Sequence, residues 1–295
     1  MSSHTELFTI RDWLRFAVSR FEEAVLFYGH GTDNSFDEAA WLILAALHLP
    51  MDTLDTFLDA VITESERKHL LHLIARRVDE RVPTAYLVRE AWLGEFRFYV
   101  DERVIVPRSH IAELLRTSLV PWVENPEEVV SAADICTGSG CLAILLAHAF
   151  PNAAVDAVDI SDEALSVAAR NVADYGMQEQ VTLVKSDMLS GLTGKLYDVI
   201  VCNPPYVNAP SMHELPPEYR HEPQLALASG EDGLEHVRSL FAHAAAHLHP
   251  GGLLIVEIGH NRDALEHAYP DMSFNWLEVA SGGDYVLLLK REQLL

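Results

Sequence analysis

The stretch VVSAADICTGSG, residues 129–140, decides how the larger part of this chain folds. It starts as an apolar run typical of a buried strand and ends in a turn containing Gly138 and Gly140, after which a helical pattern begins. Glycines at such a turn let the backbone bend sharply and approach a ligand closely. The third glycine and the basic residue of a phosphate-binding loop are missing, which argues against ATP. A tight turn without a ligand is the alternative interpretation.

Beyond this stretch, strand-like and helical patterns alternate along the chain. Apolar runs typical of strands cover 129–135, 154–160, 181–184, 197–202 and 253–258, and helical patterns cover 141–150, 162–175 and 233–248. Such alternation predicts βαβ units and a parallel sheet. The final runs, 274–279 and 285–290, are joined by Ser281-Gly282-Gly283-Asp284, a hairpin-like connection that predicts an antiparallel last strand.

The first eighty residues have a helical pattern instead. Apolar residues at helical spacing cover 9–28, and two capping boxes, Ser35 with Glu38 and Thr63 with Glu66, predict further helix starts. Between residues 96 and 106, apolar residues alternate around Asp101-Glu102, which predicts a β-hairpin. We therefore expect a helical domain at 1–88, a hairpin linker at 89–108 and an α/β domain at 109–295.

Composition and charge exclude several classes of protein. The chain has 295 residues, of which 49% are hydrophobic, as in globular proteins with a sizeable core. Its 21 Lys and Arg stand against 44 Asp and Glu, so the formal net charge is −23. This charge would repel phosphates, which argues against stable binding to nucleic acid or to an anionic membrane. A basic protein is the partner that the charge favours.

The cysteines and histidines predict neither disulfides nor a metal site. The three cysteines have no disulfide or zinc spacing, which suits a reducing compartment. No signal peptide or membrane span is indicated, so we expect a cytoplasmic protein. His243 and His247 are four apart on an expected helix, but no acidic residue lies between them, and a solvated helix face is the better interpretation.

Two acidic positions after strands suggest a nucleoside site. Asp159 ends the second strand, 19 residues after Gly140, where a carboxylate can accept hydrogen bonds from both ribose hydroxyls. Its alternative role is to cap the helix that begins at the next residues. Asp187 could accept a hydrogen bond from an adenine amino group while Met188 covers the ring, although a loop acid and a core methionine would show the same pattern.

The tetrapeptide Asn203-Pro204-Pro205-Tyr206 follows the apolar run 197–202 and has the most specific chemistry. Two prolines fix the backbone, so the Asn203 side-chain oxygen and the Pro204 carbonyl can both accept from one planar NH2 group, while Tyr206 packs on its plane. An amide nitrogen is a poor nucleophile because its lone pair is delocalised. Two fixed acceptors orient that lone pair toward an electrophile, which is catalysis by positioning and electrostatics.

The set formed by residues 134–140, Asp159, Asp187 and the tetrapeptide resembles class I S-adenosylmethionine-dependent methyltransferases that methylate planar nitrogens. Within this class, the chain resembles the protein-(glutamine) methyltransferases, which carry a helical N-terminal domain, a linking hairpin, a Pro-Arg segment and this tetrapeptide. The resemblance covers nearly the whole chain. It implies a seven-stranded, Rossmann-like α/β sheet whose last strand is antiparallel.

Short motifs distinguish two branches of that family. The release-factor branch typically has Pro-Arg-Pro-Glu-Thr after the hairpin, where this chain has Pro-Arg-Ser-His-Ile at 107–111. The motif Glu-Tyr-Arg-His-Glu-Pro at 218–223 and the ending at 282–284 resemble the branch that methylates the third protein of the large ribosomal subunit. The resemblance thus implies methylation of a glutamine in this basic ribosomal protein, with release factors as the alternative substrate.

The resemblance implies a role for each matching position. Residues 137–140 would lie along the methionine part of S-adenosylmethionine, Asp159 would hold the ribose, and Asp187 with Met188 would hold the adenine. The predicted cofactor site is Asp134, Cys136, Thr137, Gly138, Ser139, Gly140, Asp159, Ile160, Asp187, Met188 and Asn203. The predicted catalytic residues are Asn203, Pro204, Pro205 and Tyr206.

Two other functions have to be weighed against this one. The same tetrapeptide occurs in enzymes that act on exocyclic amines of nucleic-acid bases, but residues 1–92 hold 9 basic and 15 acidic side chains and the remainder 12 and 29. Neither part offers a basic surplus for phosphate contacts. A non-catalytic cofactor-binding module is disfavoured by the intact tetrapeptide. Arg108 and Arg220 could guide the substrate or pair with acidic residues.

Overall fold

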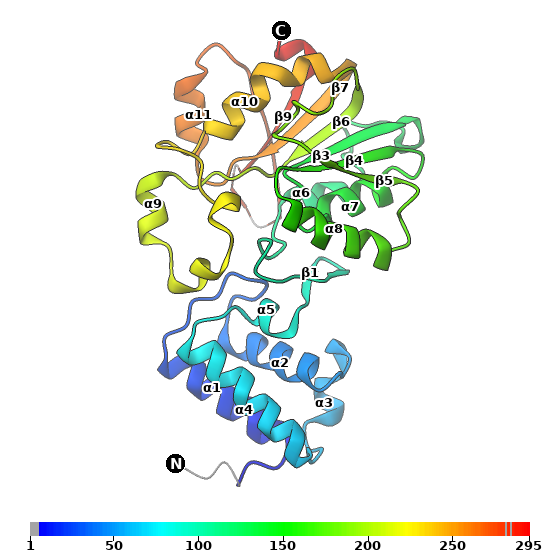
Figure 1. Cartoon of the computed structure of the whole chain (residues 1–295). Coiled ribbons are helices and arrows are strands. Elements are labelled where there is room, and N and C mark those ends of the chain that lie inside the picture. The colour runs from blue at the N-terminus through cyan, green and yellow to red at the C-terminus, as the bar shows by residue number, and fades with distance from the viewer. Residues whose placement is uncertain (1–5, 281, 284) are drawn as a thin grey trace. The chain divides into compact units, whose positions relative to one another are not determined.

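The computed structural model describes residues 6–280, 282–283 and 285–295 and divides the chain into two compact units. The helical unit comprises Met1–Ala91 and Pro216–His221, and the sheet unit comprises Trp92–Leu215 and Glu222–Leu295 (Figure 1). A short segment from the second half of the chain therefore belongs to the helical unit, which the sequence patterns did not predict.

The described residues of the helical unit form five α-helices: α1 (Ile10–Glu23), α2 (Ser35–Ala46), α3 (Leu54–Phe57), α4 (Glu64–Asp79) and α5 (Thr84–Val88). Helices α1, α2 and α4 contact one another around a core that includes Trp13, Phe21, Ile43 and Leu70. The predicted capping box at Thr63 and Glu66 is confirmed. The one predicted at Ser35 is wrong, because Asn34 is the N-cap and its side chain accepts from the Asp37 N–H.

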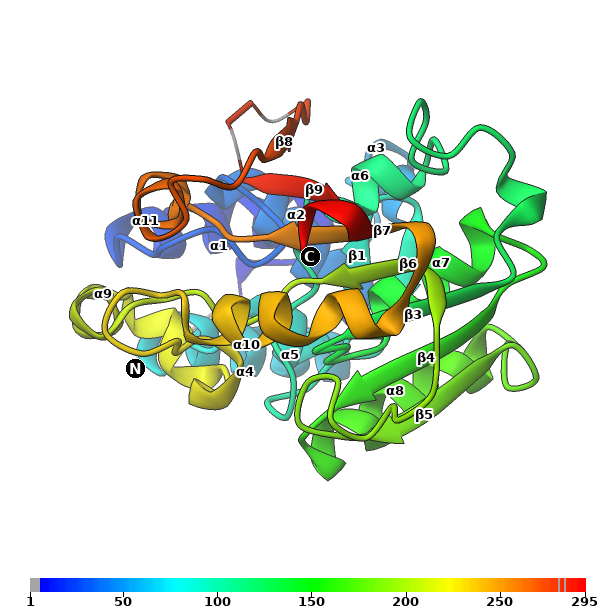
Figure 2. The ribbon, with the colours of Figure 1, turned by 90° about the horizontal axis from the view of Figure 1, so that it is seen from above.

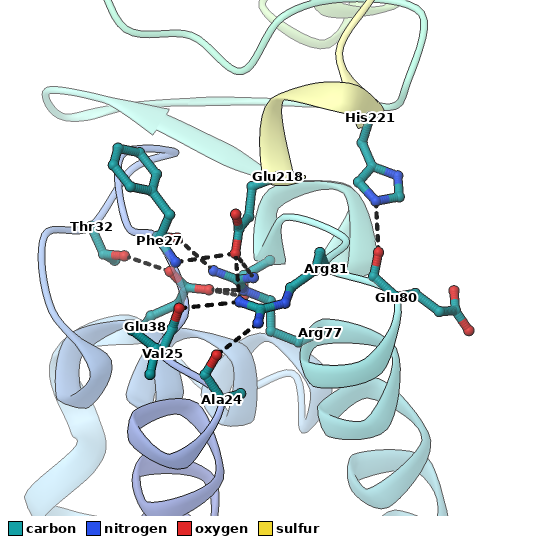
Figure 3. Close-up of polar contacts among 11 residues, drawn as sticks. Ala24, Val25, Phe27, Thr32, Glu38, Arg77, Glu80, Arg81, Glu218 and His221 are labelled. Carbon is teal, nitrogen blue, oxygen red and sulfur yellow. Dashed lines mark hydrogen bonds and ion pairs between the residues drawn. The ribbon is translucent and has the colours of Figure 1, made fainter. Parts of the chain in front are cut away.

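Glu38 is not part of a cap because its carboxylate binds a buried arginine (Figure 3). Arg77, on α4, donates from Nε to Glu38, from Nη1 to Glu218 at 3.2 Å and from Nη2 to the Phe27 carbonyl at 2.8 Å. Thr84 Oγ1 donates to Glu38 at 2.8 Å. These bonds distribute the positive charge of Arg77 over two carboxylates and a carbonyl inside the helical unit.

The main sheet of the sheet unit has seven strands in the order β5-β4-β3-β6-β7-β9-β8. They are β3 (Ser131–Ile135), β4 (Ala154–Asp159), β5 (Val181–Lys185), β6 (Tyr197–Cys202), β7 (Leu248–Glu257), β8 (Asn275–Leu277) and β9 (Val286–Lys290). The first five are parallel, whereas β9 is antiparallel to both β7 and β8, as predicted. The predicted connection between the last two strands includes positions 281 and 284, which lie outside the described residues.

Helices pack on both faces of this sheet (Figure 2). One apolar core contains residues of α6 (Ile111–Leu115), α7 (Cys141–Ala149) and α8 (Asp162–Asp174), and the other contains residues of α10 (Glu235–Ala244) and α11 (Arg262–Ala268). The sequence patterns predicted α7, α8 and α10 but not α11 or the short α9 (Ala209–Glu214). Within the described part of the chain, none of the helices is both long and apolar enough to cross a membrane.

The structure contains a β-hairpin, but its strands lie a few residues before the predicted ones. Strands β1 (Ala91–Leu93) and β2 (Phe96–Phe98) form a separate two-stranded sheet, and Gly94 in the turn between them has a φ of +64°. The segment expected to be the second strand has no regular structure. Asp101, the expected turn residue, instead accepts hydrogen bonds from Arg103 and from the Tyr99 hydroxyl.

Candidate active site

A pocket in the sheet unit lies where four parallel strands end. Because β3, β4, β5 and β6 run parallel and in register, the segments that follow them meet at one edge of the sheet. The pocket is lined by Arg103, Val104, Ile105, Cys136, Gly138, Val158, Asp159, Ile160, Ser161, Ala164, Ser186, Asp187, Met188, Asn203, Pro205, Pro223, Leu225, Ala226 and His236. Eight of these residues belong to the predicted site.

The glycine turn after β3 serves two purposes. Gly138 lines the pocket with a φ of +54°, and an added Cβ would meet no atom within 4 Å, so its backbone faces open space. Gly140 starts α7 with a φ of +81°, and its Cβ would stand 3.1 Å from that of Ala168. Gly138 is therefore open to a ligand, whereas Gly140 permits close packing of α7 on α8.

Several predicted cofactor residues are buried beneath the turn, where they support it without lining the pocket. Asp134 is fully buried and accepts from the Thr137 hydroxyl at 2.6 Å. Its other oxygen has no hydrogen-bond partner among the described residues, and burial raises its pKa to about 7. Thr137, Ser139 and Gly140 likewise are absent from the lining. Cys136 does line the pocket, and it has a φ of +64°, a conformation that favours glycine.

Asp159, at the end of β4, lines the pocket and binds the glycine turn. Its Oδ2 accepts from the Gly138 N–H at 2.9 Å, and its Oδ1 accepts from the Ser161 N–H at 2.9 Å. It does not cap α8, because Ser161 is the N-cap and accepts from Ala164. Each carboxylate oxygen has a second lone pair available to a ligand. Burial raises the pKa of Asp159 above its ordinary value.

The loop after β5 places one polar and one apolar side chain on the pocket wall. Asp187 is exposed, whereas Met188 is 7% exposed and has a φ of +48°. The Met188 sulfur lies 3.7 Å from the Cys136 sulfur, which joins this loop to the glycine turn. Ile160 and Leu225, both more than 40% exposed, add apolar surface to the same pocket. A flat apolar ring with a polar edge would find both kinds of contact here.

The tetrapeptide after β6 brings Asn203 and Pro205 to the pocket. Asn203 Oδ1 is buried and has no hydrogen-bond partner among the residues that the structure describes. Because an unpartnered buried oxygen is costly, its place on a pocket wall indicates that a ligand donates to it. Pro204 is buried, and Tyr206 is half-buried beside the lining rather than in it.

Among the lining residues that the sequence did not predict, two have titratable side chains, Arg103 and His236. Arg103 follows the hairpin, and it binds the Asp101 carboxylate, whose pKa falls to about 2 mainly because of that hydrogen bond. His236, on α10, has its Nδ1 2.9 Å from the hydroxyl of the buried Ser229, and burial lowers its pKa. Arg103 lies in an irregular segment and His236 is one of 15 histidines, so no local pattern distinguished them.

The structure also locates the residues whose roles the sequence did not decide and those for which it predicted no role. Arg108 forms an ion pair with the buried Glu222, with Nη2 2.6 Å from Oε2, whereas Arg220 is exposed in the helical unit. His243 and His247 do not share a helix, since α10 ends at Ala244, and each ring contacts a backbone carbonyl. In the described ranges, no three histidine, cysteine or acidic side chains are grouped to hold a metal, and the cysteines are free.

Comparison with known proteins identifies similar sequences over nearly the whole chain. The model of the methyltransferase small domain matches residues 117–215. The ribosomal protein uL3 glutamine methyltransferase of Neisseria meningitidis serogroup A is 59% identical over 98% of this chain and 95% of its own length. The proteins of the same name from Bordetella pertussis and Burkholderia pseudomallei are 58% and 52% identical, each over 99% of this chain and 98% of their own length.

Solved structures share the architecture at much lower identity. The hMettl16 catalytic domain, crystallised in complex with MAT2A 3'UTR hairpin 6, is 16% identical to this chain and superposes with a TM-score of 0.50. The match covers 78% of this chain and 84% of that one. At this identity the likeness concerns the fold alone.

Proposed function

The chain belongs to the family of ribosomal protein uL3 glutamine methyltransferases, and we propose that its own substrate is a glutamine side chain of ribosomal protein uL3. The sheet unit has the class I methyltransferase fold, with seven strands of which the last is antiparallel. The enzyme is a glutamine methyltransferase and its methyl donor is S-adenosylmethionine. The family and the fold predicted from the sequence are thereby confirmed.

The unpartnered Asn203 oxygen is the observation on which the catalytic role of the tetrapeptide depends. Asn203 Oδ1 is buried on the pocket wall, where it can accept one hydrogen of an incoming amide NH2. The Pro204 carbonyl is the second proposed acceptor, because the rigid backbone of two successive prolines holds it beside Asn203. The Tyr206 ring would pack on the amide plane.

The residues on the remaining pocket walls fit a nucleoside with a charged amino-acid tail. Asp159 offers lone pairs for the two ribose hydroxyls, and the open backbone at Gly138 admits the tail. Met188, Ile160 and Leu225 would contact the adenine faces while Asp187 accepts from the adenine amino group. When bound, S-adenosylmethionine supplies an electrophilic methyl group on a positively charged sulfur.

The chain's own contribution to the reaction is to orient and desolvate the acceptor. Asn203 and the Pro204 carbonyl would hold both amide hydrogens, so the nitrogen lone pair would point into the pocket. The acceptor nitrogen would gain the methyl group as the bond between that group and the cofactor sulfur breaks, which leaves neutral S-adenosylhomocysteine. The nitrogen would then release one proton to solvent. Fixed acceptors stabilise the positive charge that develops on this nitrogen during transfer.

The charge of the enzyme supports a basic protein substrate. At a net charge of −23, the chain attracts a basic ribosomal protein at long range and repels ribosomal RNA. We propose that free uL3, or uL3 in an early assembly intermediate, is methylated in the cytoplasm, and that the helical unit contributes to its recognition. Release factors are the competing substrates and nucleic-acid amines are a more distant alternative.

A substrate panel tests the proposed function. Purified enzyme is incubated with isotope-labelled S-adenosylmethionine and equal concentrations of unmethylated uL3, a release factor or RNA, and the products are mapped by mass spectrometry. We expect one added methyl group on a uL3 glutamine and at least tenfold slower transfer to the other substrates. Faster transfer to the release factor would overturn the uL3 assignment, and transfer to RNA alone would overturn the protein substrate altogether.

A further inference from the structure

The loop that follows β7 contacts Tyr206, which lies four residues after the end of β6. The Asn261 side-chain Nδ2 donates to the Tyr206 carbonyl oxygen at 2.7 Å. The Tyr206 ring lies against Gly259, where an added Cβ would stand 2.7 Å from Cε2 and 2.8 Å from Cδ2. Strands β6 and β7 are parallel neighbours, with Cys202 opposite Val256, so their following loops leave the same edge of the sheet.

Gly233 keeps the space around this hydrogen bond free of side chains. A Cβ at Gly233 would stand 2.5 Å from the Tyr206 carbonyl oxygen and 2.6 Å from Asn261 Nδ2, and its φ of +79° also favours glycine. Val207, the residue after Tyr206, donates to the Leu227 carbonyl and accepts from the Ser229 N–H, both at 2.8 Å. Hydrogen bonds therefore fix both the Tyr206 carbonyl and the backbone of the residue that follows it.

Asn261 directs its amide to this loop instead of to its own helix. It is the N-cap residue of α11, and asparagine is among the best capping residues because its side-chain oxygen can accept from the first helical N–H groups. Here the Asn261 side chain makes no capping hydrogen bond. Its stabilising contact is with Tyr206, 55 residues earlier in the chain.

We propose that Asn261 and Gly259 are positioning residues for methyl transfer, a role that rests on the proposed function of the tetrapeptide. Two prolines precede Tyr206 and allow little rotation, so a shift of its backbone would be transmitted to the Pro204 carbonyl and to Asn203. The contact with Gly259 fixes the ring that would pack on the acceptor amide. A displacement of about 1 Å at such a site can slow a reaction about a hundredfold.

Substitution of Asn261 separates positioning from capping. Asp is as good an N-cap as Asn, so Asn261→Asp would leave the enzyme unaffected if Asn261 served α11 alone. A carboxylate cannot donate to the Tyr206 carbonyl and would repel it. We expect kcat for uL3 to fall at least tenfold in Asn261→Asp, with the Kd for S-adenosylhomocysteine within twofold of wild type. An unchanged kcat would overturn the role of Asn261.

A double-mutant cycle tests Gly259. We expect Gly259→Ala to lower kcat at least tenfold in the wild-type background but less than twofold in Tyr206→Ala, where the ring that the new methyl group would displace is absent. Gly251→Ala is the matched control, because Gly251 also has a left-handed φ of +78° but its Cβ would meet no atom within 4 Å. Equal losses from Gly259→Ala in both backgrounds would contradict positioning through Tyr206.

A readout independent of turnover separates this proposal from the proposed function. In protein labelled with 3-fluorotyrosine, the Tyr206 19F signal is assigned by its loss in Tyr206→Phe. We expect this signal to shift in Asn261→Asp and in Gly259→Ala but not in Gly251→Ala. If wild-type enzyme does not methylate uL3, the proposed function fails while the signal still reports on Tyr206. An unmoved signal in both variants would overturn the positioning role whatever the substrate.

Discussion

Arg77 and Glu218, 141 positions apart in the chain, form an ion pair inside the helical unit, with side-chain exposures of 1% and 0% (Figure 3). Burial alone would raise the pKa of Glu218, but hydrogen bonds from the Phe27 N–H and from Arg77 outweigh it and lower the pKa. The carboxylate is therefore ionised, and it holds the segment Pro216–His221 in the helical unit. His221 adds a second contact, 2.8 Å from the Glu80 carbonyl.

The first prediction concerns Arg77. Arg77→Met would remove the buried counter-charge of Glu38 and leave Glu218 with Arg81, whose Nη1 lies 3.4 Å from Oε1. Breaking a buried pair costs about 3–5 kcal/mol. We expect hydrogen exchange in α2 and α4 to accelerate by the corresponding factor. The control is Arg76→Met, because Arg76 pairs with Glu80 at the surface, where such a pair contributes about 0.5 kcal/mol or less. Equal acceleration in both variants would contradict the importance of the buried network.

Local patterns in the helical unit were predictable and long-range pairs were not. The box at Thr63 and Glu66 was predicted because both partners lie within one helical turn. Glu38 also lies three residues after a serine, yet its carboxylate binds Arg77, 39 positions away. Nothing in a single sequence indicates which distant charge a carboxylate meets, so the Ser35 box was predicted wrongly.

The same distinction explains the site. Asp159, Asp187 and Asn203 were assigned from their place after buried strands, because parallel strands bring their carboxyl ends together. Arg103 and His236 reach the pocket through tertiary packing of a loop and a helix whose sequences carry no such marker. The contacts of Tyr206 come from Gly259 and Asn261 on the loop after β7 and from Gly233 before α10, which only the folded structure brings together.

The second prediction concerns Glu257, which ends β7 and accepts from the Ser109 hydroxyl at 2.6 Å and from the His110 N–H at 2.9 Å. Burial raises its pKa from 4.5 to about 7. Because the pKa is raised in the folded state, the protonated carboxyl stabilises the fold relative to the ionised one. This stabilisation is fully present below pH 4.5 and is lost as the pH rises through about 7. A shift of this size corresponds to about 3 kcal/mol in the free energy of unfolding.

Glu257→Gln mimics the protonated carboxyl at every pH. We therefore expect the variant to gain stability relative to wild type above pH 7, and the difference to shrink as pH falls toward 4.5. Urea unfolding at pH 5 and pH 8 measures this, with Glu278→Gln as the exposed control. Asp134 also titrates in this range, but it does so in both proteins, so its effect cancels in the difference between their free energies of unfolding. A stability difference between variant and wild type that grows at low pH would show that the predicted direction of the pH dependence is wrong.

The third prediction concerns Asp159. In a desolvated pocket, its hydrogen bonds to the ribose are charge-assisted and contribute roughly 1.5–3 kcal/mol each. Asp159→Asn should weaken S-adenosylhomocysteine binding at least tenfold in calorimetry. Because burial raises the Asp159 pKa, wild-type affinity should fall as pH drops through that raised value, at a pH above the ordinary 3.8. The variant lacks this dependence, and parallel pH profiles would refute the ribose contact.

The fourth prediction concerns Asn203. Asn203→Ala removes one of the two proposed acceptors for the amide hydrogens and leaves most of the pocket intact. We expect kcat to fall about a hundredfold or more, as when an oxyanion-hole donor is removed, while the Kd for the cofactor changes less than threefold. Single-turnover methylation of uL3 measures the chemical step. Near-normal turnover would remove Asn203 from the catalytic residues.

The fifth prediction concerns the encounter with the substrate and depends on charge. A net charge of −23 accelerates association with a free basic protein, whereas the phosphates that surround uL3 in a mature subunit oppose it. We expect unmethylated free uL3 to be modified faster than uL3 in the mature subunit. We also expect the rate with free uL3 to fall with added salt, since the Debye length is about 8 Å near 0.15 M ionic strength. Initial rates at equal substrate concentrations across a salt series measure both effects.

The helical unit could instead dock on the subunit through local contacts that override the net charge, although its acidic excess opposes this. Faster methylation of the mature subunit at low salt would establish that alternative and leave the glutamine methyltransferase assignment intact.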